Sequence, residues 1–332
     1  MGNDPDCNGC APCGQRVKQG LDIERLDLMR SASRRAFLTG RCAAQTPWEL
    51  FCLAMRRKVL GEFLEMEYRD GTGQARLFPK QAADVHRARA LCAQYGVVLA
   101  LTDAVSKQQI PGRSVLWVDP ARYLDGLRRL TPERAAWFVQ PGCRLAELRD
   151  AGLPQFAHQP EYVTVAAWLA DRHAHDGRTG GTALSGVSHA SVLLSDGTTV
   201  GLGAFGEQDQ RPLAGLRLQR LIPGLFQLAH SESGRACRQS EYWPAAYRLD
   251  ALTPRPGHGI NLSHLLLGHG GCLGWVEWLV IEPVDPPGSI RRGKNVASTD
   301  ASMDLDAQVK TRFDDSGLFP DQADTASLAV AR

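Results

Sequence analysis

The stretch between residues 78 and 119 alternates a helix with two buried strands, and this alternation restricts the folds open to the chain. The segment ADVHRARALCAQYG, residues 83–96, repeats apolar residues at helical spacing, and Gly96 stands where such a helix would end. VVLAL at 97–101 and SVLWVD at 114–119 are short apolar runs typical of buried strands. The pattern predicts a small α/β unit in this part of the chain.

Turn signals separate further strands from short helices. The segment RAAWFVQPGCRLAELRDAGLP, residues 134–154, is typical of a strand, a turn at Pro141-Gly142 and a short helix that ends at Gly152. ASVLLSDGTTVGLG, residues 190–203, predicts a β-hairpin around Asp196-Gly197. Helices and hairpins mixed in this way predict an α+β fold.

The amino-acid composition is that of an ordinary globular protein. The 332 residues are 43% hydrophobic and 22% charged, enough for a full core in one large domain or two. A net charge of +2 gives no overall electrostatic reason to expect nucleic acid or an anionic membrane as partner. No apolar run reaches the roughly 18 residues of a membrane span.

Two features bear on the cellular compartment. Nine cysteines, an odd number in a large chain, favour reduced thiols in a cytosol over a secreted disulfide framework. SASRRAFLTG, residues 31–40, carries the pattern of a twin-arginine export signal. Because Arg41, Gln45 and Pro47 interrupt the apolar stretch that should follow, a cytoplasmic location is expected and export is the alternative.

Residues 1–75 are expected to form an N-terminal extension with one helix. In TPWELFCLAMRRKVL, residues 46–60, Thr46 and Glu49 form a capping box and Pro47 takes the first helical position. The apolar residues of this segment recur on one face, which predicts that the helix packs against another element.

Ahead of that helix, CNGCAPCG contains Cys7, Cys10 and Cys13, with two residues between each cysteine and the next. Thiolates at this spacing can converge on an iron-sulfur cluster or a zinc ion. A fourth ligand is missing, because Val17 stands where the bacterial ferredoxin run has its next cysteine. Two interpretations therefore remain open. One is a metal site whose fourth ligand comes from elsewhere, and the other is a tail whose thiols have no role in metal binding.

The segment NLSHLLLGHGGCLGWVEWLVIEP, residues 261–283, sets a glycine-rich turn, Gly268 to Gly274, between a helix-like run and a strand-like run. Glycine permits positive φ and lets the backbone approach a neighbouring chain or a ligand closely. The turn therefore marks a place where something lies close to the main chain.

These segments occur in an order that resembles the FAD-binding domain of FAD-linked oxidases. The segments are FPKQAADVHRARALCAQYGVVLAL, VDPARY, VQPGCRLAEL, VTVAAWLADRHAHDGRTGG, SVLLSDGTTVGLG, AAYRLDAL and the glycine-rich segment above. The resemblance is greatest to the branch of D-lactate and D-2-hydroxyglutarate dehydrogenases, whose flavin domain is of the vanillyl-alcohol-oxidase type. It covers residues 76–285 and implies a two-lobed α+β domain, with lobes at about 76–140 and 141–285.

The resemblance also implies positions for an FAD site. These are Thr102, Asp103, Ala104, Val105, Ser106 and Lys107 in the phosphate loop, Pro141, Gly142, Thr164, Val165, Ala166, Ala167, Gly177, Gly180, Gly181, Gly268, Gly271 and Val276. The family's phosphate loop is glycine-rich, because bare backbone N–H groups can then curl around the pyrophosphate. In this sequence that loop has no glycine and contains the carboxylate of Asp103, and Ala166 and Ala167 replace the glycines of a second turn.

A separate substrate domain follows the flavin domain in the resembled family. Here residues 286–332 are polar with little periodicity and are expected to form a mostly disordered tail. The resemblance therefore implies an FAD-binding oxidoreductase subunit that dehydrogenates a 2-hydroxy acid, with a partner chain supplying the substrate site. The alternative is a degenerate flavin fold without cofactor, acting as a scaffold or regulatory subunit.

Local clusters of reactive side chains each have a plainer interpretation. Asp171, His173, His175 and Asp176 could bind a metal, but a polar loop is favoured. His269 in the glycine-rich turn could face a flavin, but capping of the preceding helix is favoured.

The remaining motifs carry less weight. The segment GVSHA around Ser188 resembles the nucleophile elbow of a hydrolase. In such an elbow a helix follows the serine, whereas here the sequence after Ser188 is typical of a strand. Trp275 and Trp278 are explained by core packing at least as well as by flavin stacking.

Overall fold

The computed structural model describes residues 46–102, 110, 112–206, 213, 215–285 and 298–322. The chain divides into two compact units, Met1–Thr46 and Pro47–Arg332. The predicted metal ligands Cys7, Cys10 and Cys13 and the phosphate-loop residues Asp103, Ala104, Val105, Ser106 and Lys107 lie outside the described residues.

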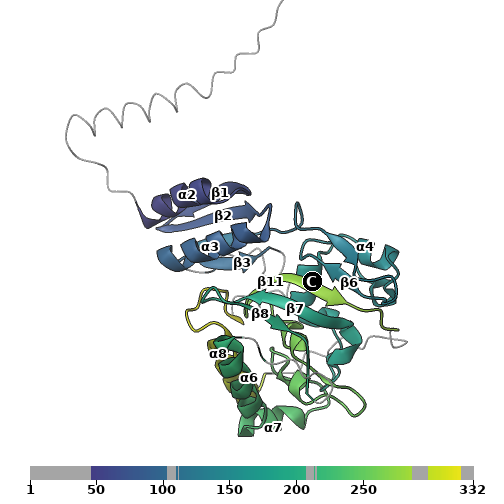
Figure 1. The fold of residues 1–332 in the computed structure, drawn as a ribbon. Coiled ribbons are helices and arrows are strands. Elements are labelled where there is room, and N and C mark those ends of the chain that lie inside the picture. The colour runs from purple at the N-terminus through teal and green to yellow at the C-terminus, as the bar shows by residue number, and fades with distance from the viewer. Residues whose placement is uncertain are drawn as a thin grey trace, which may run out of the picture. The chain divides into compact units, whose positions relative to one another are not determined.

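A four-stranded sheet begins the described unit (Figure 1). Its strands are β1 (Glu62–Arg69), β2 (Thr72–Phe78), β3 (Val98–Leu101) and β4 (Val115–Val118), in the order β1-β2-β4-β3. The helices α2 (Pro47–Lys58) and α3 (Ala82–Tyr95) share one buried apolar cluster with this sheet, in which Phe51 and Val85 meet Leu77 and Leu99. Gly96 ends α3 at φ +67°, as predicted from the sequence.

Helix α2 and strands β1 and β2 belong to the same folded unit as the rest of the four-stranded sheet. β2 pairs antiparallel with β1 on one side and parallel with β4 on the other. The boundary expected between residues 75 and 76 therefore falls inside a paired central strand, and residues 47–75 are not a separate extension.

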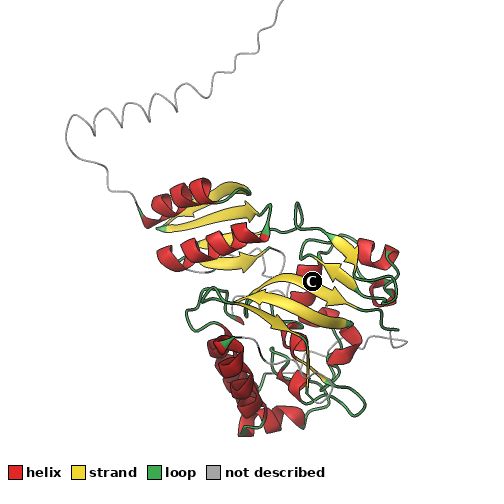
Figure 2. Cartoon of the chain, viewed as in Figure 1, coloured by secondary structure: helices red, strands yellow, loops and turns green. Residues whose placement is uncertain are grey.

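The second sheet has five antiparallel strands. They are β5 (Leu127–Arg129), β6 (Trp137–Val139), β7 (Val187–Leu193), β8 (Thr199–Leu202) and β11 (Trp275–Ile281), in the order β5-β6-β11-β7-β8 (Figure 2). β7 and β8 form the predicted hairpin, with Gly197 at φ +90°. Because β5 and β6 belong to this sheet, the lobe boundary expected at 140/141 lies before β5.

Short helices and a two-stranded ribbon accompany the five-stranded sheet. The α-helices are α4 (Leu145–Asp150), α5 (Val165–Ala170), α6 (Leu216–Ala229) and α7 (Glu232–Arg238), and the ribbon pairs β9 (Ala204–Phe205) with β10 (Ile260–Asn261). The 3-10 helices are η1 (Pro154–Phe156), η2 (Arg172–Ala174), η3 (Thr182–Ser185), η4 (Leu249–Leu252) and η5 (Leu262–Leu266). The predicted α+β class is confirmed.

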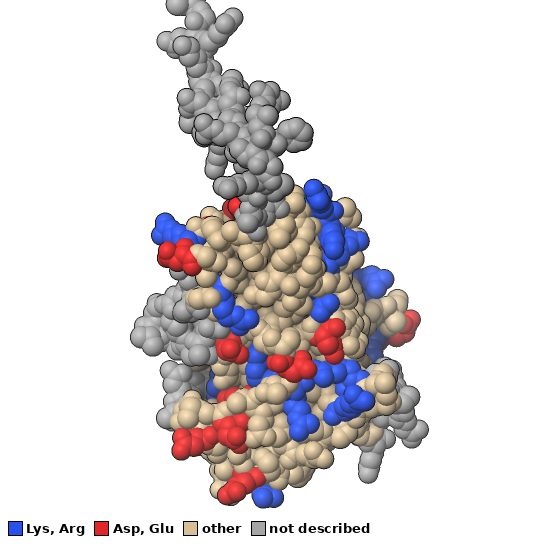
Figure 3. All heavy atoms as spheres, turned by 90° about the vertical axis from the view of Figure 1, so that its left-hand side faces the viewer, with Lys and Arg blue, Asp and Glu red and all other residues tan. Residues whose placement is uncertain are grey.

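Charged side chains of both signs are interspersed on the face of the molecule drawn in Figure 3. In the described part of the chain, no helix is long and apolar enough to cross a membrane.

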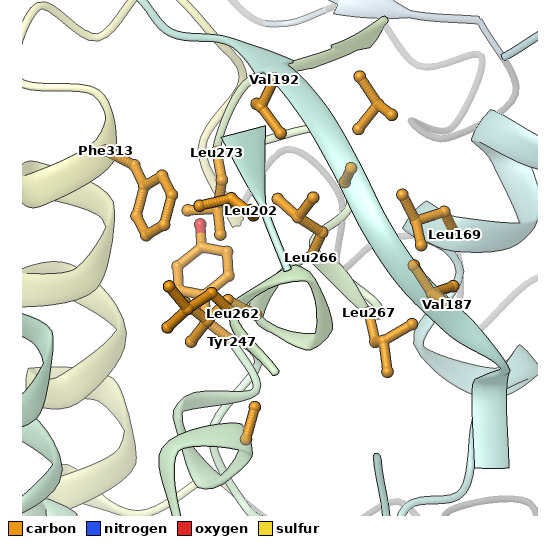
Figure 4. Packing of buried hydrophobic residues seen from close by; sticks show 14 of the residues in the cluster. Leu169, Val187, Val192, Leu202, Tyr247, Leu262, Leu266, Leu267, Leu273 and Phe313 are labelled. Carbon is orange, nitrogen blue, oxygen red and sulfur yellow. The ribbon is translucent and has the colours of Figure 1, made fainter. Parts of the chain in front are cut away.

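The C-terminal segment is ordered where the sequence predicted a tail. Residues Asp300–Phe313 form α8, which begins with a capping box at Thr299 and Ser302. Its Leu305, Val309 and Phe313 are buried in the main core, and Figure 4 shows the Phe313 ring beside Leu273 and Tyr247. The prediction of disorder is therefore wrong for residues 298–322, because the four-residue spacing of these apolar side chains matches a helix that gains stability by packing.

Candidate functional site

The candidate site lies where β3 of the first sheet meets the glycine-rich turn and β11 of the second. A cavity of about 10 Å³ there is lined by Leu99, Leu101, Ala166, His269, Gly271, Gly274, Trp275, Val276 and Phe319. Three of the residues implied by the resemblance, Ala166, Gly271 and Val276, are therefore brought together. A space of this size holds about one water molecule.

Thr164, Val165, Ala166 and Ala167, which the resemblance assigned to an FAD site, form the N-cap and first turn of α5. Its first two amides donate within the protein, Val165 N to Cys143 O at 2.8 Å and Ala166 N to Pro141 O at 2.9 Å. Ala167 N donates to Oγ1 of the N-cap residue Thr164 at 3.2 Å. These three donors are already used by the turn at Pro141 and by the helix cap.

The glycine-rich turn closes the other end of α5. Gly268 N donates to Leu169 O at 2.7 Å and Gly270 N donates to Ala170 O at 3.0 Å. Gly268, Gly270 and Gly271 have φ of +74°, +64° and +76°, which lets the chain reverse and present these amides to the helix. The element lying close to this turn is therefore the C-terminal end of α5, whose last carbonyls need donors.

The loop of Gly177, Gly180 and Gly181 is held by a buried ionic network. Gly180 N donates to Asp250 Oδ2 at 2.7 Å, and Arg248 binds both oxygens of Asp250, with Nε 2.9 Å from Oδ1 and Nη2 2.8 Å from Oδ2. A second cavity of about 30 Å³ borders this loop at Gly181 and His175. Arg248 and Asp250 lie in the segment AAYRLDAL, one of those that carry the family resemblance, but nothing in that segment marked either residue as part of a site.

The residues described around both cavities do not form a space for FAD. Ligands of that size occupy pockets of about 300–1,000 Å³, whereas these cavities measure about 10 and 30 Å³. The backbone amides of Val165, Ala166, Gly268, Gly270 and Gly180 donate to acceptors within the protein. Thr102 follows β3, and its Oγ1 is buried and has no hydrogen-bond partner among the residues that the structure describes.

The other candidate clusters have structural roles. His173 is exposed, whereas His175 is buried with Nε2 3.0 Å from Trp168 O. No group of three or more potential metal ligands occurs among the described residues. Ser188 lies within β7, so no nucleophile elbow forms there.

His269 does not use its side chain to cap η5. Its backbone N donates to Leu266 O at 3.3 Å, but its Nδ1 is buried with no partner in the described part of the chain, and the residue borders the small cavity. Trp275 is also buried, and its Nε1 has no partner in the described structure. Trp278 lies against Phe138, with ring centroids 5.6 Å apart and the ring planes tilted by 35°.

Three buried histidines make the fold sensitive to acid. Burial lowers the pKa from 6.5 to about 4 in His175, about 4 in His264 and about 3 in His269. Since the unfolded chain takes up these protons near pH 6.5, their contribution to stability is present above that pH and is lost as the pH falls from 6.5 through about 4. Asp306 acts in the opposite direction, because burial raises its pKa to about 6 and its protonation favours the folded state.

We expect the variant His269→Leu to remove one of these linked protons. The slope of unfolding free energy against pH between about 6.5 and 4 should fall by the equivalent of about one proton. Urea unfolding at a series of pH values measures this slope. A slope in His269→Leu equal to that of the wild type would contradict the prediction.

No protein-family model and no curated protein matches the sequence. Solved structures with a similar fold include an alkyldihydroxyacetonephosphate synthase, at 16% identity and a TM-score of 0.39, over 64% of this chain and 32% of that chain. They also include 4-ethylphenol oxidase from Gulosibacter chungangensis, at 13% identity and 0.43, over 74% and 44%. Physcomitrella patens BBE-like 1 aligns at 13% identity and 0.40, over 70% and 44%.

This chain thus spans less than half the length of each of those proteins. At these TM-scores the likeness is remote, and the fold assignment rests on the elements described above.

Proposed function

We propose that this chain is a flavin-domain-like α+β module that works without bound FAD, as a scaffold or regulatory subunit of an oxidoreductase. The observation that carries the proposal is the close packing around Ala166, Gly271 and Val276, three positions that the resemblance assigned to FAD, where the described residues leave a cavity of about 10 Å³. The ordered motifs of residues 76–285 support the relation to flavin domains, and the internal bonding of the α5 and glycine-turn amides supports the loss of the cofactor.

A second candidate is an FAD-binding subunit that dehydrogenates a 2-hydroxy acid together with a partner chain. It is favoured by three buried polar atoms that have no partner among the described residues: Thr102 Oγ1, directly after β3, and His269 Nδ1 and Trp275 Nε1, whose residues line the cavity. Buried polar atoms are nearly always hydrogen-bonded, so each of these calls for a partner such as a ligand or an ordered water. For FAD to bind, the space between the sheets would have to open.

A visible absorption spectrum of protein purified without air, followed by acid release of any chromophore, separates the two candidates. We expect no flavin in the purified protein, and no saturable quenching of FAD fluorescence below about 1 mM, which corresponds to binding weaker than about −4 kcal/mol. Stoichiometric FAD would contradict the cofactor-free proposal.

The second candidate would then be tested directly. Dye reduction with D-lactate, glycolate or D-2-hydroxyglutarate would be measured with any co-purified chain present. If an FAD-loaded complex reduced no dye with any of these substrates, the 2-hydroxy-acid assignment would be contradicted. The same spectrum reports on Cys7, Cys10 and Cys13, because an iron-sulfur cluster absorbs broadly in the visible range.

A further inference from the structure

The Phe319 side chain belongs to the C-terminal segment and lies in the space between the two sheets. It is 1% exposed and lines the small cavity together with His269 and Trp275. It joins the apolar cluster of the four-stranded sheet, whereas Phe313, six residues earlier, belongs to the main core. The segment between them therefore leads from one core to the other.

Specific contacts hold this segment in place. Leu99 N, on the edge strand β3, donates to Leu318 O at 2.9 Å. Asp314 accepts from Leu318 N at 3.0 Å and from Phe319 N at 2.9 Å. Phe319 is thus positioned by hydrogen bonds to its own backbone and to that of the residue before it.

Lys310 connects the same segment to the glycine-rich turn. Its Nζ lies 2.6 Å from Asp314 Oδ2, 2.8 Å from Cys272 O and 3.2 Å from Phe319 O. The ammonium group therefore joins α8, the glycine-rich turn and the end of the segment at one point.

Two residues that line the cavity together with Phe319 each carry a buried polar atom that has no hydrogen-bond partner among the described residues. His269 is 3% exposed and Trp275 is 4% exposed, and His269 Nδ1 and Trp275 Nε1 have no hydrogen-bond partner in the described structure. The Trp275 N–H can only donate, and a phenyl edge offers it no acceptor. A heteroaromatic ring with an acceptor nitrogen would satisfy this donor where a phenyl ring cannot.

We propose that Phe319 occupies a latent binding site for a small planar heteroaromatic ring, and that residues 314–319 close this site from within the chain. The proposal rests on the proposed function, since it identifies what fills the space of the absent cofactor. Removing the Phe319 ring should create an apolar cavity with a Trp275 N–H donor at its border. Engineered apolar cavities of about 150 Å³ take up benzene.

The test uses the full chain with Phe319→Ala and two ring probes of equal shape, benzene and pyridine. Wild-type protein should bind neither, and Phe319→Ala should bind both, as measured by NMR titration and by ligand-induced shifts of the unfolding temperature. In Phe319→Ala/Trp275→Phe the ratio of pyridine to benzene affinity should fall about tenfold, the worth of one hydrogen bond. The ratio removes the general difference in hydrophobicity between the probes.

Phe313→Ala is the matched control, because it removes a buried phenyl ring near the same segment from the other core. When Trp275→Phe is added to Phe313→Ala, the ratio of pyridine to benzene affinity should not change. If Phe319→Ala does not fold, Phe319→Val gives a smaller cavity for the same comparison. A folded Phe319 variant that binds neither probe, or a ratio that Trp275→Phe leaves unchanged, would overturn the proposal.

Failure of this inference differs from failure of the proposed function. FAD bound stoichiometrically to wild-type protein refutes the cofactor-free function. Absence of ring binding in a folded Phe319 variant refutes only the latent site.

Discussion

Replacing Arg248 by methionine should lower the free energy of unfolding by about 3–5 kcal/mol, the usual effect of removing one partner from a buried ion pair. Arg248 is 4% exposed and its partner Asp250 is 1% exposed. The guanidinium also donates to Asp176 O at 2.5 Å and to Arg178 O at 3.1 Å. The variant would leave an unpaired carboxylate and two carbonyl oxygens without this donor.

Chemical denaturation of the wild type, Arg248→Met and Arg248→Met/Asp250→Asn measures this effect. The double variant should be more stable than Arg248→Met, because the side-chain amide oxygen introduced by Asp250→Asn could still accept from Gly180 N without carrying a buried charge. A single variant within about 1 kcal/mol of wild type would show that the pair is solvated in solution.

Substituting Gly142 by alanine should cost about 3 kcal/mol or more, at the upper end of overpacking effects. A Cβ at this position would lie 2.1 Å from Pro120 O and 2.8 Å from Leu124 O. Both neighbours are main-chain atoms, and Gly142 N already donates to Leu124 O at 2.7 Å. The clash therefore cannot be relieved by the movement of a flexible side chain.

Gly201→Ala is the matched control for this prediction. Gly201 lies in β8, and a Cβ built there meets nothing within 4 Å. We expect a change within about 1 kcal/mol, in the stabilising direction, because alanine loses less backbone entropy than glycine on folding. Equal destabilisation by the two variants in thermal and urea unfolding would contradict the steric explanation for Gly142.

Both predictions concern residues around positions that the family resemblance assigned to a flavin. Gly142 lies against the backbone at Pro120, and Gly180 donates to the buried Asp250. These glycines are therefore explained by packing and hydrogen bonding within the protein. A glycine that matches a cofactor motif can be required by the fold alone.

Local sequence determined most of the elements. The apolar spacing of residues 83–96 with Gly96 predicted α3, and Asp196-Gly197 predicted the β7–β8 hairpin. Such signals are readable because capping and turn formation depend on a few neighbouring residues. The segment TDASMDLDAQVKTRF also contained a helix signal, but its polar composition led to a prediction of disorder.

Tertiary structure decided the lobe boundaries and the state of the candidate site. Strand pairing between β2 and β4 joins residues 74–77 to residues 115–118, and no local pattern encodes that pairing. Likewise, the partners of the α5 and glycine-turn amides are distant in sequence, with Gly268 N reaching Leu169 O and Ala166 N reaching Pro141 O. The sequence indicated which backbone amides could face a ligand. Only the folded chain showed that carbonyl groups of the protein accept from several of them and that the Phe319 ring lies beside the glycine-rich turn. The physical reason is that buried backbone donors are nearly always paired and that protein interiors are closely packed, and both depend on which distant segments the fold brings together.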